Sequence, residues 1–241
     1  MTSLIAKGIA IPGRLQSISM EVQTGELVAI VGPNGGGKTS LLRALARVEG
    51  HQGHVTIDGN DLDRAGEAQR RQLLAFLPAS RDVRWPIAVR DLVALGLSRP
   101  DPDRISALVT AFELQSLADR PTDALSTGER ARVLMARALA AKPRVLMLDE
   151  PLSNLDPYWV LRFLDIVVQA ASEGQTVMVA LHDLAHLPRF DRTILVADGA
   201  IQMDETPADL LASERFGEVF RVRQANGGWQ LNPTADPQSL R

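Results

Sequence analysis

The sequence has no cysteine, no long apolar run and little net charge. Without cysteine the chain forms neither a disulfide nor a thiolate-metal site, which is compatible with a reducing compartment. The longest apolar runs, RVLMLDE and TVMVALHD, are far too short for a membrane span, and the N-terminal stretch MTSLIAKGIAIPGRLQS has no signal-peptide pattern. A net charge of −3 argues against bulk electrostatic binding to nucleic acid or anionic membranes. We therefore expect a cytoplasmic protein without a nucleic-acid partner.

Apolar runs that alternate with helix-like segments make up most of the chain. Its 241 residues, 45% hydrophobic and 23% charged, suit one large globular domain or two small ones. Continuous apolar strands between helical segments indicate an α/β protein whose parallel sheet is buried on both faces. We expect strands at 17–22, 26–32, 54–62, 144–150, 176–183 and 193–205, and helical segments at 37–48, 88–140 and 158–173.

Local signals refine two of these segments. In 37–48, the helical period places Leu41, Leu42, Leu45 and Val48 on one face. In 193–205, the Asp198-Gly199 pair predicts a hairpin turn, as Asp58-Gly59 does earlier in the chain.

The stretch GPNGGGKT matches G-x-x-x-x-G-K-[ST] in full, with a strand before it and a helix after it. Small residues let backbone N–H groups form an anion cradle at the positive end of the helix dipole. Lys38 would reach the β- and γ-phosphates, and the Thr39 hydroxyl would ligate Mg²⁺. A glycine-rich turn that contains lysine by chance is disfavoured by the flanking elements. The predicted nucleotide-binding residues are Gly32, Pro33, Asn34, Gly35, Gly36, Gly37, Lys38, Thr39 and Ser40.

Two carboxylates follow the apolar run VLML. Neighbouring residues on a strand point to opposite sides, so Asp149 and Glu150 need not share one role. Asp149 is the expected carboxylate on the Mg²⁺ side, and Glu150 is the candidate base that polarises the attacking water. The alternative, a solvated strand end before Pro151, is weakened by the complete phosphate loop.

Five motifs, GPNGGGKT, LSTGERARV, VLMLDEP, SNLD and LHD, occur in the order and spacing of ABC-type ATPase domains. Up to about residue 222, the chain resembles the ATP-binding subunits of ABC transporters. This resemblance implies a P-loop NTPase core with a mostly parallel sheet, an N-terminal antiparallel β subdomain and an inserted α-helical subdomain. It implies an ATPase domain at 1–222 with the helical subdomain at about 84–140, and a peripheral tail at 223–241.

The resemblance also implies a head-to-tail dimer that sandwiches two ATP molecules. Ser126, Thr127, Gly128 and Glu129 take the signature positions, which face the nucleotide of the other copy. Ser126 and Glu129 also read as a capping box, and a free helix N-terminus suits a γ-phosphate as well. STGE differs from the commoner SGGQ at Thr127 and Glu129, and we expect both to be tolerated.

Three further assignments follow. Asp156 before Pro157 reads equally well as a helix N-cap or as the family's dimer-coupling residue. His182 in ALHDL is assigned to contact with the γ-phosphate rather than to packing at the edge of the core. The other histidines, at 51, 54 and 186, match no motif and are expected at the surface or in packing.

Two family features are missing. The segment KGIAIPGRLQ contains no aromatic residue to stack on adenine, so Ile11 or Arg14 would have to cover the base. The family's loop glutamine, which contacts Mg²⁺ or the attacking water and reports to the membrane partner, is replaced by Ala79. Ser80 or a water would have to substitute for it, because Gln72 lies before the strand. We interpret Ala79 as a rewired Mg²⁺ and permease contact rather than the mark of a dead enzyme.

The stretches WPIAVRDLVALGLSR and ERFGEVFRVRQANGGWQLNP resemble the ATPases of iron-siderophore, haem and cobalamin importers. This implies an ATP-hydrolysing subunit on the inner face of the membrane, with a separate permease and a substrate-binding protein beyond it. Apolar surface from Val83, Trp85, Pro86 and Ile87 would receive the permease. The alternatives are a soluble non-transport ABC ATPase and a nucleotide-dependent scaffold with impaired hydrolysis.

Overall fold

The structure is a computed structural model and describes residues 2–50, 52–80, 83, 86–225 and 228–231. Its centre is a six-stranded sheet in which five neighbouring strands are parallel and only the edge strand β10 is antiparallel. In sheet order the strands are β10 (Ala200–Glu205), β9 (Arg192–Ala197), β3 (Leu27–Val31), β8 (Thr176–Ala180), β7 (Val145–Asp149) and β6 (Leu74–Leu77).

A second, antiparallel sheet is built from the N-terminal part of the chain. Its strand order is β2-β1-β4-β5, and helix α1 packs between it and the central sheet. The fold is therefore a P-loop NTPase core joined to an antiparallel β subdomain, as the resemblance implied. The strands and the two helices of this region are β1 (Thr2–Ile11), β2 (Leu15–Gln23), β4 (His54–Ile57), β5 (Asn60–Asp61), α1 (Lys38–Leu45) and α2 (Glu67–Leu73).

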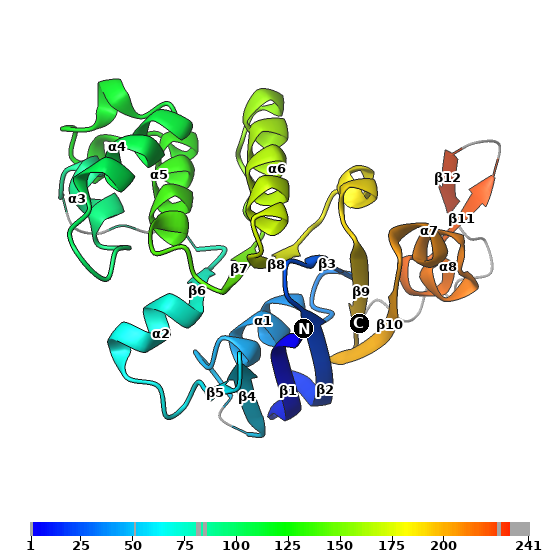
Figure 1. Ribbon diagram of the computed structural model, residues 1–241. Coiled ribbons are helices and arrows are strands. Elements are labelled where there is room, and N and C mark those ends of the chain that lie inside the picture. Colours follow the sequence, from blue (N-terminus) through cyan, green and yellow to red (C-terminus); the bar gives the residue numbers. More distant parts are fainter. Residues whose placement is uncertain (1, 51, 81–82, 84–85, 226–227, 232–241) are drawn as a thin grey trace.

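The inserted helices form a lobe at one end of the molecule, and the C-terminal elements lie at the other end (Figure 1). The lobe contains α3 (Val89–Ala94), α4 (Pro102–Ala111), η1 (Gln115–Leu117), η2 (Thr122–Ala124) and α5 (Thr127–Ala140). The rest of the chain contributes α6 (Pro157–Ser172), η3 (Leu184–Arg189), α7 (Pro207–Ala212), α8 (Glu214–Phe220), β11 (Val222–Ala225) and β12 (Gly228–Leu231).

Alternate residues of the central strands enter two different hydrophobic cores. Ala29 and Val31 of β3 pack on the side of α5 and α6, whereas Val28 and Ile30 pack on the side of α1 and the N-terminal sheet. Because a strand sends successive side chains to opposite faces, a sheet covered on both sides needs apolar residues at every position. This is the reason for the continuous apolar runs from which the parallel sheet was predicted.

Several local expectations are confirmed and one is wrong. Asp198 and Gly199 both have positive φ values and join β9 to β10, as the hairpin prediction required. Leu41, Leu42 and Leu45 are fully buried on one face of α1, but Val48 is 58% exposed. The helix ends at Leu45 and the chain then turns through Arg47, whose φ is 54°, so Val48 no longer continues the helical face.

Candidate nucleotide site

The phosphate loop lies between the end of β3 and the start of α1, where strand and helix hold both of its ends. Asn34, Gly35, Lys38, Thr39 and Ser40 line a pocket of about 760 Å³, together with Gly37. The Lys38 ammonium donates hydrogen bonds to the carbonyl oxygens of Gly32 (2.9 Å) and Pro33 (3.1 Å). Burial lowers the pKa of Lys38, and the carboxylates of Glu150 and Asp149 oppose that change. A buried cation against a ring of small residues is suited to bind a polyphosphate.

The remaining loop residues brace the pocket rather than line it. A Cβ on Gly32 would lie 1.9 Å from the carbonyl oxygen of Val196, and one on Gly36 would lie 2.7 Å from the same atom. The Gly199 N–H donates to the Gly36 carbonyl (3.0 Å), so the β9–β10 turn is joined to the loop by hydrogen bonding. Only glycine permits this close approach of backbone to backbone.

Asp149 and Glu150 have different surroundings at the end of β7. Asp149 is the last residue of the strand and is buried, whereas Glu150 lies beyond the strand with φ 51°. The two carboxylates therefore differ in their surroundings because the backbone is left-handed at Glu150. We had expected the difference to come from the alternation of side chains along a strand. Thr39 Oγ1 donates to Asp149 Oδ1 (3.1 Å), which connects the carboxylate to the phosphate loop.

The electrostatics of Asp149 are dominated by its burial. Burial raises the pKa of this carboxyl, the Thr39 hydrogen bond opposes the rise, and the Glu150 charge adds to it. Asp149 Oδ2 is buried and accepts no hydrogen bond from any described residue. A buried oxygen without a donor, next to a threonine hydroxyl, fits a hard cation such as Mg²⁺. Within the described part of the chain no cluster of three or more acidic or histidine side chains surrounds it, so phosphate and water would complete the coordination shell.

His182 follows β8 and reaches Glu150 directly. Its Nε2 lies 2.6 Å from Glu150 Oε1, and both side chains are partly exposed. The two residues also border a second, smaller cavity of about 210 Å³. The structure thus groups five predicted residues: Lys38, Thr39 and Glu150 line the pocket, Asp149 contacts Thr39, and His182 contacts Glu150. Of the other histidines, His54 is exposed at the surface, and Nε2 of His186 lies 3.6 Å from Oδ2 of Asp183. His51 is outside the described residues.

Ala79 follows β6, and its side chain is exposed. Its backbone amide approaches Asp149 and counteracts the rise in the pKa of that carboxyl. Ser80 borders a different, apolar groove, and Gln72 is in α2, so neither side chain lines the nucleotide pocket. In this structure, therefore, the loop presents backbone to the acidic end of the site, where the resemblance implied an amide side chain.

The signature positions begin helix α5, away from the pocket of their own chain. Ser126 is the N-cap, and the predicted capping box is present: Ser126 Oγ accepts from the Glu129 N–H (3.3 Å), and Glu129 accepts from the Ser126 N–H (2.8 Å). The latter hydrogen bond is the main reason that the pKa of Glu129 is lowered. Of the described residues that line the nucleotide pocket, none belongs to 126–129.

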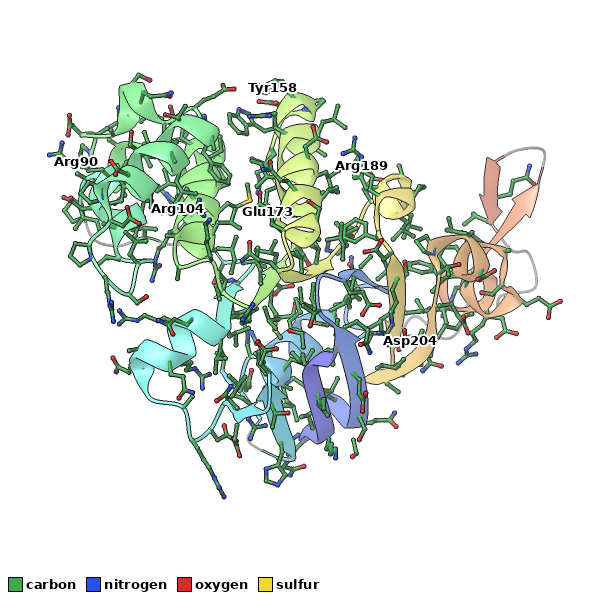
Figure 2. All side chains as sticks on the ribbon, viewed as in Figure 1. Arg90, Arg104, Tyr158, Glu173, Arg189 and Asp204 are labelled. Atoms are coloured by element: carbon green, nitrogen blue, oxygen red, sulfur yellow. The ribbon has the colours of Figure 1, made fainter. Side chains whose placement is uncertain are left out.

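The segment before α6 lies against the signature positions. Asp156 caps α6 by accepting from the Trp159 N–H (2.9 Å), as predicted, with Pro157 at the first helical position. A Cβ on Gly128 would lie 3.6 Å from the Asn154 carbonyl oxygen. At the same end of α6, the Tyr158 hydroxyl donates to Glu113 Oε1 (2.5 Å) in the helical lobe; Figure 2 shows Tyr158 at this end.

A family model described as ABC transporter matches residues 15–153, which is more than half of the sequence. The chain belongs to the ABC transporter family. Together with the phosphate loop and its carboxylates, this identifies an ATP-binding subunit with ATPase activity. Within the described ranges, none of the helices of this ABC subunit combines the length and apolar character that crossing a membrane requires.

Curated relatives cover most of the ABC subunit. It is 35% identical over 232 residues to the hemin import ATP-binding protein HmuV of Rhodococcus jostii (strain RHA1), covering 90% of this chain and 80% of that protein. It is 30% identical over 222 residues to the petrobactin import ATP-binding protein FpuC of Bacillus anthracis, covering 87% and 82%. The cobalamin import ATP-binding protein BtuD of Halobacterium salinarum (strain ATCC 29341 / DSM 671 / R1) is 34% identical over 224 residues, covering 88% and 56%.

Solved structures show the same fold. The ATP-binding subunit of an ABC transporter superposes with a TM-score of 0.79 at 22% identity, covering 90% of this chain and 94% of that one. The dimeric ATP-binding cassette MJ0796, in a post-hydrolysis state bound to ADP and Pi, superposes with a TM-score of 0.77 at 23% identity, covering 85% and 98%. At these identities the likeness supports the ABC ATPase fold alone.

Some residues of the pocket were not identified from the sequence. Gly13, from the turn between β1 and β2, and Leu15 and Gln16, at the start of β2, line it together with Asp198 and Gly199. The Asp-Gly pair was recognised as a turn, but its contact with the phosphate loop joins positions far apart in the chain, which no local pattern reveals. Of the two residues considered for covering the base, Ile11 is buried in the core and Arg14 lines the pocket.

Proposed function

We propose that the chain is the ATP-hydrolysing subunit of an importer for an iron-siderophore complex, haem, cobalamin or a similar metal chelate. The observation that carries the transport part is an apolar groove of about 700 Å³, whose lining includes Ser80, directly after Ala79 in the sequence. Ala79, whose backbone amide approaches Asp149, therefore lies in sequence directly before a residue that lines this groove. The choice of cargo is supported by the names of the relatives, which are import ATP-binding proteins for hemin, petrobactin and cobalamin.

Each proposed catalytic role follows from the position of the residue. Lys38 would exchange its two carbonyl acceptors for the β- and γ-phosphates of ATP. Thr39 and Asp149 would hold Mg²⁺, which supplies neutralisation of phosphate charge when bound. Glu150 would orient and polarise the attacking water, because its carboxylate reaches the pocket from a fixed turn. His182 would keep that carboxylate in place and donate to the γ-phosphate.

We propose that two copies of the chain bind two ATP molecules between them, head to tail. Ser126, Thr127, Gly128 and Glu129 would contact the nucleotide of the other copy, and Asp156 would couple the two sites. Two observations support this arrangement. The signature positions do not line the described pocket of their own chain, and the N-terminus of α5 lies against the segment before Asp156, so both can meet one partner.

The groove is the proposed docking site for an amphipathic helix of the permease. Its apolar lining comes from β6, α3 and α5 and includes Leu77, Leu95 and Leu134. Val83 and Ile87 border it, Pro86 is exposed, and Trp85 lies outside the described residues. Binding there would hold the chain on the inner face of the membrane, with a substrate-binding protein on the far side of the permease.

The proposed domain boundaries follow from the same arrangement. The ATPase domain would span 1–222 with the helical subdomain at about 84–140, and 223–241 would be a peripheral tail. The separate lobe formed by α3, α4 and α5 supports the inner boundary (Figure 1).

The test is co-purification with a co-expressed permease, followed by uptake of ferric siderophore, hemin or cobalamin into proteoliposomes. Leu95→Asp places a charge in the groove, and Val48→Asp is the matched control because both side chains are 58% exposed. We expect Leu95→Asp to abolish co-purification and leave ATP binding intact, while Val48→Asp changes neither. Equal binding of both variants to the permease would contradict the docking site.

Ala79 favours a second candidate function, a nucleotide-dependent scaffold with impaired hydrolysis, because alanine offers no side-chain donor or acceptor. A soluble non-transport ABC ATPase is the other alternative. Phosphate release by the permease complex separates all three. Binding without hydrolysis supports the scaffold, and hydrolysis by a chain that captures no permease supports the non-transport enzyme.

A further inference from the structure

The nucleotide pocket has a phosphate end and a second end formed by the turn between β1 and β2 with the start of β2. Lys38, Thr39 and Glu150 mark the phosphate end, and Gly13, Arg14, Leu15 and Gln16 line the other together with the Asp198-Gly199 turn. A nucleotide whose phosphates occupy the loop must place its sugar and base outside the loop. The base therefore meets the turn between β1 and β2.

A purine base is a flat ring system and needs a flat partner for stacking. None of the described residues that line the pocket is aromatic. The side chains of Ile11 and Leu15 are committed to the core, where these residues are 3% and 4% exposed. The Gln16 amide donates to the Asp198 carbonyl (3.0 Å) and is used in bracing the turn. Arg14 is the remaining long side chain at this end of the pocket.

The Arg14 guanidinium is oriented by an ion pair and is still accessible. Its Nη2 pairs with Glu49 Oε1, and its side chain is 49% exposed. The second oxygen of Glu49 pairs with Arg43 Nη1 (3.3 Å), so one carboxylate fixes two guanidinium groups. Guanidinium hydrogen bonds lie in the plane of the group. The ion pair with Glu49 therefore uses an edge of the Arg14 group and not the faces on which a ring would stack.

We propose that Arg14 stacks on the purine base of bound ATP and takes the place of an aromatic residue. The proposal rests on ATP binding by this pocket and names the residue that holds the base. Stacking uses the π-face that every base possesses, so it gives affinity with little choice between adenine and guanine. We therefore expect this pocket to bind ATP and GTP with similar affinity.

Isothermal titration of the full chain with ATP, GTP and inorganic tripolyphosphate tests the proposal. Arg14→Ala should weaken binding of ATP and GTP about thirtyfold, the middle of the range for loss of one base stack, and leave tripolyphosphate unchanged. Arg14→Tyr should restore both nucleotides because it supplies a flat ring, and Arg14→Lys should not. Arg64→Ala is the control, since that side chain is 88% exposed away from the pocket and its loss should change nothing.

Glu49→Gln guards against a folding artefact, because it keeps Arg14 and removes only its orienting charge. It should weaken ATP binding by a smaller factor than Arg14→Ala does. An equal loss of tripolyphosphate binding in Arg14→Ala, restoration by Arg14→Lys, or unchanged ATP affinity in Arg14→Ala would each overturn the proposal. Each of these three outcomes would contradict the role of Arg14 but not the proposed importer function. A wild-type chain that bound no ATP would contradict the importer function itself.

Discussion

His182 Nε2 and Glu150 Oε1 are 2.6 Å apart, and this contact joins the ends of two neighbouring strands, β8 and β7. Glu150 has left the strand with φ 51°, a conformation that costs a non-glycine residue free energy. The contact with His182 helps to hold the carboxylate in that position. We therefore treat the two side chains as one unit in hydrolysis.

A double-mutant cycle tests this unit. Glu150→Gln and His182→Ala should each lower kcat by roughly 10²–10⁴-fold with little change in ATP affinity, because both act on the attacking water. The double variant should be scarcely slower than the worse single variant, since residues that act together are not additive. Steady-state phosphate release and equilibrium ATP binding supply the two readouts. Independent, multiplying effects on kcat would show that the contact has no catalytic role.

Ala79→Gln tests the rewired loop. Its backbone amide already approaches Asp149, so a glutamine there would add a donor and an acceptor next to the proposed Mg²⁺ position. We expect higher permease-stimulated ATPase activity or higher transport, and a smaller change in the isolated chain. Ala79→Leu adds comparable bulk without polarity and should not raise either rate. If glutamine changes neither rate, the rewiring hypothesis fails.

Gly32→Ala tests the close packing behind the phosphate loop. The new Cβ would meet the Val196 carbonyl oxygen at 1.9 Å, at a φ of 154° that L-residues rarely adopt. We expect loss of ATP binding and a lower unfolding temperature by circular dichroism, because neither backbone segment can move without breaking its sheet. Gly66→Ala is the control: its φ is −66° and a Cβ there meets no atom within 4 Å. A stable, ATP-binding Gly32→Ala chain would contradict this packing.

The α5 capping box should respond to acid. The Ser126 N–H donates to the Glu129 carboxylate and lowers its pKa from the ordinary value of 4.5. A lowered folded-state pKa means that the stabilisation is present above 4.5 and is lost as the pH falls through the folded-state value. Glu129 is partly exposed, so we expect no more than about 1 kcal/mol. Urea unfolding of wild type and Glu129→Gln at a series of pH values measures the difference, which should shrink in acid. A pH-independent difference would exclude a role for the charge.

The sequence predicted the parts of this molecule that depend on local chemistry. The phosphate loop with its flanks, the Ser126–Glu129 capping box, the Asp156 N-cap and the Asp198-Gly199 turn could all be read from a few neighbouring residues. Each is a short-range arrangement in which the residue type determines the backbone, so one sequence is sufficient.

Other features depend on contacts between distant segments. Strand β1 was not identified, because Gly8 and three irregularities in its pairing with β2 interrupt its pattern. Helix α2 was missed as well, since it is short and buries only Leu73. The sequence did not predict the hydrogen bond between Gly199 and Gly36, or that Ile11 is buried while Arg14 lines the pocket. Both features depend on where the hairpins pack, and contacts between distant segments determine that packing.

The central claim is that this chain hydrolyses ATP with Glu150 at a site coupled to a permease. Steady-state phosphate release by the chain with its permease, beside the same complex carrying Glu150→Gln, tests it most directly. We predict turnover that the permease stimulates in the wild type and that the variant loses by at least about 10²-fold while it still binds ATP. Wild-type turnover no faster than that of Glu150→Gln, with the permease present, would contradict the account.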